Sequence, residues 1–151
     1  MSTPEKNLEV ARRWARDVLN GHNVASVDEI LTPTHIIHDH SSPDLEMHNK
    51  EGMKGIRRRF REIAYPDAVL TTEEMYAAGD RVVHRFTFRG THTGMLWNIA
   101  PTGKRIEIPH VSLYRFENGQ IAETWAWWDS LGMMQQIGIL PKTEDLRNPN
   151  A

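Results

Sequence analysis

The sequence contains no cysteine. This absence excludes both a disulfide framework and a thiolate nucleophile, so packing alone has to hold the fold together. No apolar run approaches the roughly 18 to 20 residues that a membrane-spanning helix needs, and residues 1–6 are polar where a signal peptide would be hydrophobic. We therefore expect a cytoplasmic protein that makes no contact with a membrane.

A strong excess of one charge is also missing, because the formal net charge is only -2. Arg57, Arg58, Arg59 and Arg61 cluster, but they belong to an amphipathic segment rather than to a basic tail. This pattern disfavours a nucleic-acid partner and predicts a solvated helix face. The 151 residues, 39% of them hydrophobic, suit one domain with its own core. We place that domain at residues 1–141 and expect residues 142–151 to form a polar tail.

Three helices are predicted in the first half of the chain. The first begins at Thr3, which can cap it, and ends at Asn20-Gly21; its buried stripe is Leu8, Ala11, Trp14, Ala15 and Val18. A short second helix, residues 24–31, is capped by Asn23 and precedes an extended piece at residues 35–40. The third helix spans residues 50–64 and buries Met53, Ile56, Phe60 and Ile63.

From Ala68 onward the hydrophobic period changes to two, and four long strands are predicted at residues 69–78, 81–93, 104–117 and 120–128. Gly79-Asp80 and Asn118-Gly119 are typical of tight hairpins, and Gly90 indicates a bend or bulge. A short helix from Ser130 to Ile137 follows. Helices followed by a meander indicate an α+β fold, with the N-terminal helices packed on one face of a strongly curved antiparallel sheet.

The concave side of such a sheet would form an apolar pocket with a few polar groups. In the last two strands, one face carries His110, Ser112, Tyr114 and Phe116, and one face carries Ala122, Thr124, Ala126 and Trp128. Counting leaves open which face of each strand is concave. The side chains that we expect to bind a substrate are Trp14, Phe60, Phe86, Trp97, Ser112, Tyr114, Ala126 and Trp128.

Three segments of the second half carry a resemblance to a known family. They are Gly90-Thr91-His92-Thr93-Gly94, Pro101-Thr102-Gly103-Lys104, and the run from Tyr114-Arg115-Phe116 through Gly119-Gln120-Ile121 to Leu131–Gly138. In order and spacing they resemble the SnoaL-like polyketide cyclases. The resemblance covers nearly the whole chain and implies the cone-shaped fold of nuclear transport factor 2, which hosts isomerases, dehydratases, epoxide hydrolases, cyclases and non-enzymatic binders. It also implies a homodimer or a larger homo-oligomer.

For the anthracycline-type cyclases, the resemblance implies an intramolecular aldol closure without a cofactor, with an aspartate on the last strand as general acid and base. The position of that aspartate corresponds to Ala126 here, while Ser112 replaces a pocket histidine and His110 a glutamine. Alanine cannot move a proton. Either the acid/base work has moved to other residues, or the reaction is a different one.

We predict His110, Asp129 and His38 as the catalytic residues. His110 lies on a strand expected to border the pocket, and imidazole exchanges protons near neutral pH, although a wall residue held by hydrogen bonds is the alternative. Asp129 follows the last strand beside Trp127 and Trp128, but it also stands where it would cap the next helix. His38 belongs to the cluster His38-Asp39-His40, in which a His-Asp pair could orient a base or an attacking water.

The remaining predictions concern ligands and pairing. No metal is expected, because the resembling families are metal-free and no fixed ligand pattern emerges, and the resemblance implies a reaction without a cofactor. Glu123 is expected to pair with Arg115 or Arg105 across strands. The apolar residues Met95, Leu96 and Trp97 lie in a long loop, which we predict to be a lid or a dimer element.

The leading hypothesis is a cofactor-free cyclase, isomerase or dehydratase that acts on a hydrophobic, carbonyl-bearing small molecule by general acid/base catalysis. Two alternatives stay open. One is a non-catalytic module that binds a small molecule or assembles with a partner. The other is an epoxide hydrolase, which would need acids and an arginine around a water molecule.

Overall fold

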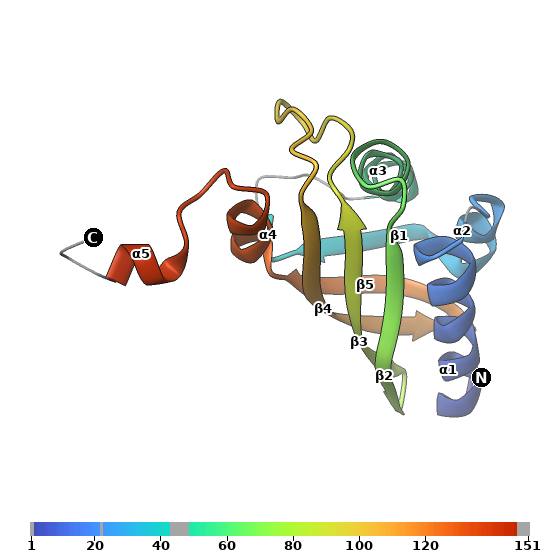
Figure 1. The fold of residues 1–151 in the computed structure, drawn as a ribbon. Helices are drawn as coiled ribbons and strands as arrows, with labels where there is room; N and C mark the ends of the chain where they lie inside the picture. The colour runs from blue at the N-terminus through green and yellow to red at the C-terminus, as the bar shows by residue number, and fades with distance from the viewer. Residues whose placement is uncertain (1, 22, 43–48, 148–151) are drawn as a thin grey trace.

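The computed structural model in Figure 1 describes residues 2–21, 23–42 and 49–147. The chain forms the predicted α+β fold, in which a five-stranded sheet carries helices on one face. In the described part of the chain, no helix is long and apolar enough to cross a membrane.

The sheet consists of β1 (Leu31–Asp39), β2 (Val69–Ala78), β3 (Arg81–Thr91), β4 (Arg105–Glu117) and β5 (Gln120–Trp128), in the order β1-β5-β4-β3-β2. Strands β2 to β5 pair antiparallel, as predicted. Their hairpins turn at Gly79 and Gly119, where positive φ angles of 57° and 80° favour glycine. β1 pairs in parallel with β5, a pairing between segments far apart in the chain that period counting did not predict.

The sheet is strongly curved. In Figure 1, β2, β3 and β4 stand upright, whereas β1 and β5 cross behind them. The register shifts between Thr72 and Glu74 and between Arg115 and Phe116, and such bulges bend a strand. The bulge predicted at Gly90 is not there, because Gly90 stays in register with Ile106. A Cβ atom at this glycine would lie 3.1 Å from the Tyr65 Cβ atom, so close packing explains the residue.

The N-terminal helices cover the concave side of the sheet. α1 (Pro4–Arg13) continues as the π-helix η1 (Trp14–Leu19), and α3 (Lys50–Arg57) continues as the π-helix η2 (Arg58–Ala64). α2 (Ala25–Ile30) is short and begins at Val24 without a side-chain cap, so the predicted cap at Asn23 was wrong. The predicted cap at Thr3 is confirmed, since its side chain accepts a hydrogen bond from the Lys6 backbone.

The prediction of a solvated arginine face was wrong for two of the four arginines. Arg57 and Arg61 are buried, whereas Arg58 and Arg59 are exposed and Ile63 is exposed instead of buried. Met53, Arg57, Arg61 and Ala64 recur at helical spacing themselves, so the buried face of this segment is rotated from the predicted one. The buried stripe therefore passes through Arg57, Arg61 and Ala64.

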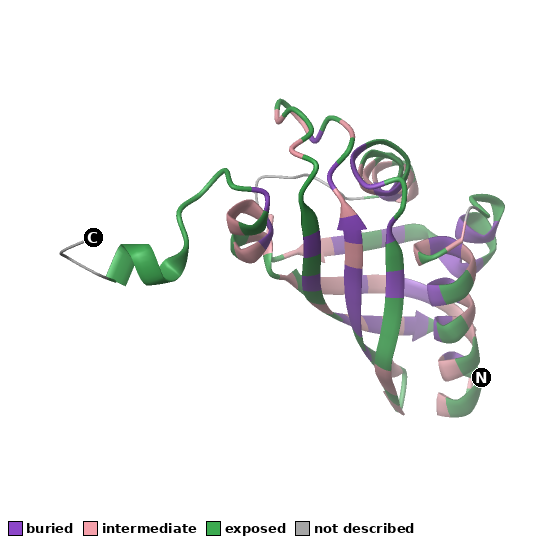
Figure 2. Ribbon diagram, in the orientation of Figure 1, coloured by how far each residue is buried: buried purple, intermediate pink, exposed green. Residues whose placement is uncertain are grey.

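Two further helices follow the sheet. α4 (Ser130–Gln136) packs against the sheet through the buried Met133. α5 (Thr143–Arg147) lies in the predicted polar tail, has no buried residue and projects away from the sheet (Figures 1 and 2). The last residues of that tail, 148–151, lie outside the described part of the chain.

Candidate active site

A cavity of about 170 Å³ lies between the concave face of the sheet and the helices. This volume has room for roughly a dozen water molecules. Its wall is mostly apolar and aromatic, which is the composition typical of small-molecule sites. The polar and charged side chains on the wall are few: Asp39, Arg57, Arg61, His110, Ser112, Tyr114 and Thr124.

Strand register shows which side chains face this cavity. His110 lies between its cross-strand neighbours Phe86 and Trp128, and all three line the wall. In the next row of the same face, Ser112 is paired with Ala126, and Ala126 is paired with Asp39 on β1. The concave face is therefore the one that carries His110, Ser112 and Tyr114 on β4 and Thr124, Ala126 and Trp128 on β5.

His110 is held by aromatic contacts. Its ring stacks on the rings of Phe86 and Trp128, with centroid distances of 4.7 and 5.9 Å. Among the residues that the structure describes, no side chain makes a hydrogen bond with it. Burial, together with a smaller effect of the nearby His84, lowers the pKa of His110 to about 3. At neutral pH the ring is therefore uncharged and offers one N–H donor and one nitrogen acceptor to the cavity.

Asp39 is the cavity residue that the list of predicted catalytic residues missed. Its carboxylate accepts hydrogen bonds from the indole N–H of Trp128, whose Nε1 lies 3.1 and 3.2 Å from the two oxygens. The backbone N–H groups of Ser41 and Ser42 also donate to Oδ1, at 2.9 and 3.1 Å. The only sequence signal was its place in the cluster His38-Asp39-His40, because its register against β5 cannot be read from the sequence.

The other two predicted catalytic residues lie elsewhere. Asp129 caps α4, where its carboxylate accepts a hydrogen bond of 2.8 Å from the backbone of Gly132. His38 lies on the outer face, where its Nε2 is 2.7 Å from a Glu123 carboxylate oxygen and its ring stacks on Trp125. Neither residue belongs to the cavity wall, so the structure does not bring His110, Asp129 and His38 together.

Of the predicted substrate-binding residues, all but one line the cavity: Trp14, Phe60, Phe86, Ser112, Tyr114, Ala126 and Trp128. Trp97 is not part of the wall. It packs edge-on against Phe60, with a centroid distance of 5.6 Å, and its φ angle of 50° is uncommon for so bulky a residue.

Two buried histidines form hydrogen bonds with hydroxyl groups of the cavity wall. His84 Nδ1 lies 3.0 Å from the Tyr114 hydroxyl, and its Nε2 lies 2.9 Å from the hydroxyl of Thr72. His35 Nε2 lies 2.9 Å from the Thr124 hydroxyl. Burial lowers the pKa of both histidines to about 4 and raises that of Tyr114, so all three are uncharged at neutral pH.

The two buried arginines bind backbone oxygens. Arg57 donates to the carbonyls of Val18 and Gly21, and Arg61 donates to those of Asn20 and Ala68. Three of these carbonyls lie at the end of η1, where helix carbonyls lack a partner. Arg57 at the end of α3 and Arg61 in η2 therefore tie this helical segment to the end of η1. The described residues contain no cluster of three histidine or acidic side chains that could hold a metal ion.

The strongly curved sheet, the helices across its concave side and the apolar cavity between them define a nuclear transport factor 2-like domain. Within this class, the chain belongs to the SnoaL-like polyketide cyclase family, whose model matches residues 9–137.

Known proteins agree with this assignment. The chain is 24% identical over 132 residues to the aklanonic acid methyl ester cyclase DauD from Streptomyces sp. (strain C5), covering 82% of this chain and 78% of that protein. The structure of TsrD from Streptomyces laurentii matches with a TM-score of 0.77 and 25% identity over 93% of this chain and 100% of the other. A candidate polyketide cyclase from Acidithiobacillus ferrooxidans matches with a TM-score of 0.76 and 27% identity over 91% and 97%.

Proposed function

We propose that this protein is a cofactor-free enzyme of the cyclase, isomerase or dehydratase type, which acts on a hydrophobic, carbonyl-bearing small molecule. The observation that carries the proposal is the uncharged imidazole of His110 in the wall of an apolar cavity. Such a cavity accepts an aromatic or aliphatic skeleton, and a fixed N–H donor there recognises a carbonyl oxygen. The relative DauD, named as an aklanonic acid methyl ester cyclase, supports this substrate class.

His110 is suited to donate a hydrogen bond to the substrate and not to accept its proton. A ring with a pKa of about 3 is a weak base, but its N–H can donate to a carbonyl oxygen that becomes an enolate or an alkoxide. The hydrogen bond strengthens as negative charge develops on that oxygen, so it stabilises the transition state more than the substrate. Asp129 and His38 do not enter this proposal, because their side chains lie outside the cavity wall.

The experiment follows proton exchange in a simple ketone. The protein is incubated in D2O with 2-acetylnaphthalene, and loss of the methyl proton signal is recorded by NMR. We expect wild type to exceed the buffer rate, and His110→Phe, which keeps an aromatic ring but no N–H, to be slower by about 10²-fold or more. The matched control is His40→Phe, because His40 stacks on Trp127 outside the cavity.

A wild-type protein that binds the ketone and leaves its exchange at the buffer rate would contradict this function and would favour a non-catalytic binding module. Binding is read separately from the quenching of tryptophan fluorescence. Equal loss of exchange in His110→Phe and His40→Phe would also contradict the assigned role of His110.

We further propose that two copies of the chain pair through the outer face of the sheet. Apolar side chains on that face are exposed on four strands: Ile36, Val83, Val111 and Trp127. Val111 and Trp127 are direct cross-strand neighbours, and exposed apolar side chains on a sheet face favour an interface there. Light scattering should show a dimer for wild type and a monomer for Trp127→Lys, whereas Leu146→Lys on the projecting α5 should stay dimeric. A monomeric wild type at high concentration would refute the pairing.

A further inference from the structure

We propose that Asp39 is the proton acceptor of the cavity, and that its carboxylate performs the work that Ala126 cannot. This inference rests on the proposed function, because it names the second group that the reaction of a carbonyl compound needs. Four observations carry it: the place of Asp39 in the sheet, its contacts, its lack of a cationic partner among the described residues and the chemistry of Oδ2.

Asp39 lies beside Ala126. The two Cα atoms are paired in the parallel register of β1 and β5, and the backbone N–H of His40 donates to the Ala126 carbonyl at 3.0 Å. Both side chains line the same cavity. Because alanine at 126 carries only a methyl group, the neighbouring carboxylate on β1 faces the space that a longer side chain on β5 would occupy.

The contacts of Asp39 fix its orientation and occupy one oxygen more than the other. Oδ1 accepts hydrogen bonds from Ser41, Ser42 and Trp128, whereas among the described residues Oδ2 accepts only the shared indole N–H of Trp128 at 3.2 Å. A carboxylate oxygen has two lone pairs, so Oδ2 keeps one for a proton from a ligand. Trp128 also stacks on His110, so one side chain positions both polar groups.

Asp39 makes no ion pair with any residue that the structure describes, in contrast to Glu123, whose two oxygens face His38 and Arg115. The two arginines on the cavity wall have other partners: Arg57 donates to backbone carbonyls and to Glu62, and Arg61 donates to backbone carbonyls. A carboxylate that pairs with none of the described cations and lies in the cavity wall is placed to accept a proton from a ligand.

The proton transfer balances without a cofactor. Oδ2 of Asp39 takes a proton from the carbon next to the substrate carbonyl, and the electron pair of that C–H bond forms the enolate. The charge moves to the carbonyl oxygen, to which His110 donates its N–H. In a cyclisation, the enolate carbon attacks a second carbonyl within the same molecule, and the proton on Asp39 then passes to the resulting alkoxide, so the carboxylate is regenerated.

The test moves the carboxylate from one strand to the next. In the 2-acetylnaphthalene exchange assay, Asp39→Asn should lose about 10²- to 10⁴-fold in rate while the ketone still binds. In the double variant Asp39→Asn/Ala126→Asp, a carboxylate faces the same space from β5, and we expect the rate to recover at least about tenfold over Asp39→Asn. The matched control is Asp39→Asn/Ala126→Asn, which has the same size without the charge and should stay slow.

The conservative variant Asp39→Glu keeps the carboxylate and should retain part of the rate, which a purely structural role of Asp39 does not predict. Exchange by Asp39→Asn within about twofold of wild type would overturn the role of Asp39. If His110→Phe is slow in the same experiment, the proposed function still stands. A charged double variant no faster than its Asn control would overturn the claim that positions 39 and 126 face the same point of the cavity.

Discussion

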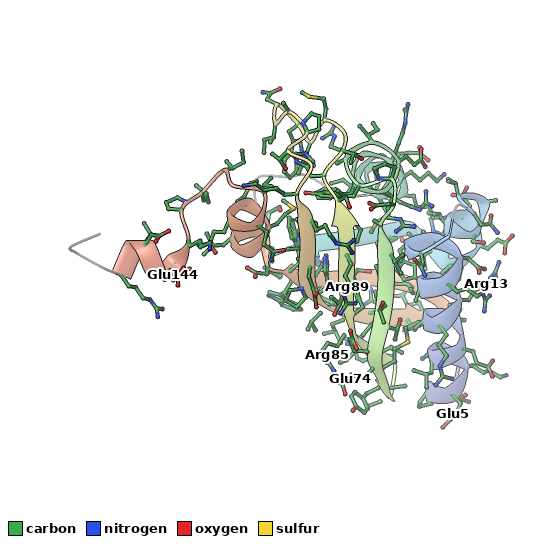
Figure 3. All side chains as sticks on the ribbon, viewed as in Figure 1. Glu5, Arg13, Glu74, Arg85, Arg89 and Glu144 are labelled. Atoms are coloured by element: carbon green, nitrogen blue, oxygen red, sulfur yellow. The ribbon has the colours of Figure 1, made fainter. Side chains whose placement is uncertain are left out.

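His38 and Asp39 are neighbours in the chain, but β1 places their side chains on opposite faces of the sheet. On the outer face, His38 and Arg115 both contact the carboxylate of Glu123. Further pairs, such as Arg85 with Glu74, are exposed to solvent (Figure 3). On the concave face, Asp39 has an indole and two backbone N–H groups as partners. Water screens the first set of charges, and the cavity wall shields the second.

The same contrast applies to the aromatic residues of β5. Trp127 is exposed on the outer face and stacks on His40, while Trp128 lines the cavity, stacks on His110 and binds Asp39. A shift of one residue along a strand therefore separates an exposed surface from the site. Charged groups on the outer face are numerous and replaceable, whereas each polar group of the cavity has a defined partner or a free atom for a ligand.

The buried histidines of the concave face should make the stability of the protein depend on pH. His35 and His84 have a pKa of about 4 in the folded protein and about 6.5 in the unfolded chain. Between these values the unfolded chain binds more protons, so the free energy of unfolding falls as the pH drops from about 6.5 to 4. The loss is about 3 kcal/mol for each histidine. Urea titrations across this range measure it.

A single variant tests this pH dependence. His35→Gln, which keeps an amide near Thr124, should flatten the dependence. An unchanged dependence in His35→Gln would contradict the assignment to this buried imidazole.

Arginines of one helical segment provide a second comparison. Arg57→Met should lower the free energy of unfolding by about 3 kcal/mol, because the carbonyls of Val18 and Gly21 lose their buried donors. Arg58→Met, on the exposed side, should change it by less than about 0.5 kcal/mol. Chemical denaturation of both variants checks the prediction, and a similar small change in both would show that Arg57 has no structural role.

The paired tryptophans test the site itself. Trp128→Phe keeps the stacking on His110 but removes the hydrogen bond to the Asp39 carboxylate, so the ketone exchange rate should fall about tenfold. Trp127→Phe should leave the rate unchanged. Measuring both at saturating ketone separates the rate from binding, and loss in the Trp127 variant alone would place the reaction on the wrong face.

The smallest effect is expected on the outer face. Glu123→Gln removes the ion pairs with His38 and Arg115, which are partly exposed, so stability should change by less than about 1 kcal/mol. Proton exchange in the ketone should be the same as in wild type. A large drop in the exchange rate would mean that Glu123 and its partners His38 and Arg115 take part in the reaction.

Period-two patterns made the antiparallel part of the sheet predictable, and β2 and β5 have the predicted bounds. The burial of Arg57 and Arg61 was not predictable, since their backbone acceptors Val18, Gly21 and Asn20 lie 36 to 41 residues away in the chain. The parallel partner of β1 was missed for a related reason: its contacts lie some 85 to 90 residues away in the chain and are chosen by packing.

Like the fold, the candidate site could be predicted from the sequence only in part. Trp128, Phe86, Tyr114 and Ser112 could be placed near a pocket because alternate residues of a strand share a face. Asp39 needed the register of β1 against β5. Asp129 was predicted as a site residue but is not one. An acid between a strand and a helix fits the sequence pattern of a helix cap as well as that of a catalytic residue, and here it is the cap.

A crystal structure of the protein with 2-acetylnaphthalene tests the central claim most directly. The account predicts the naphthalene ring in the cavity between Phe86 and Trp128, the carbonyl oxygen within hydrogen-bond distance of a His110 ring nitrogen, and the methyl carbon next to Asp39 Oδ2. A ketone bound against His38 and Trp125 on the outer face, or one in the cavity with its methyl group turned away from Asp39, would contradict it.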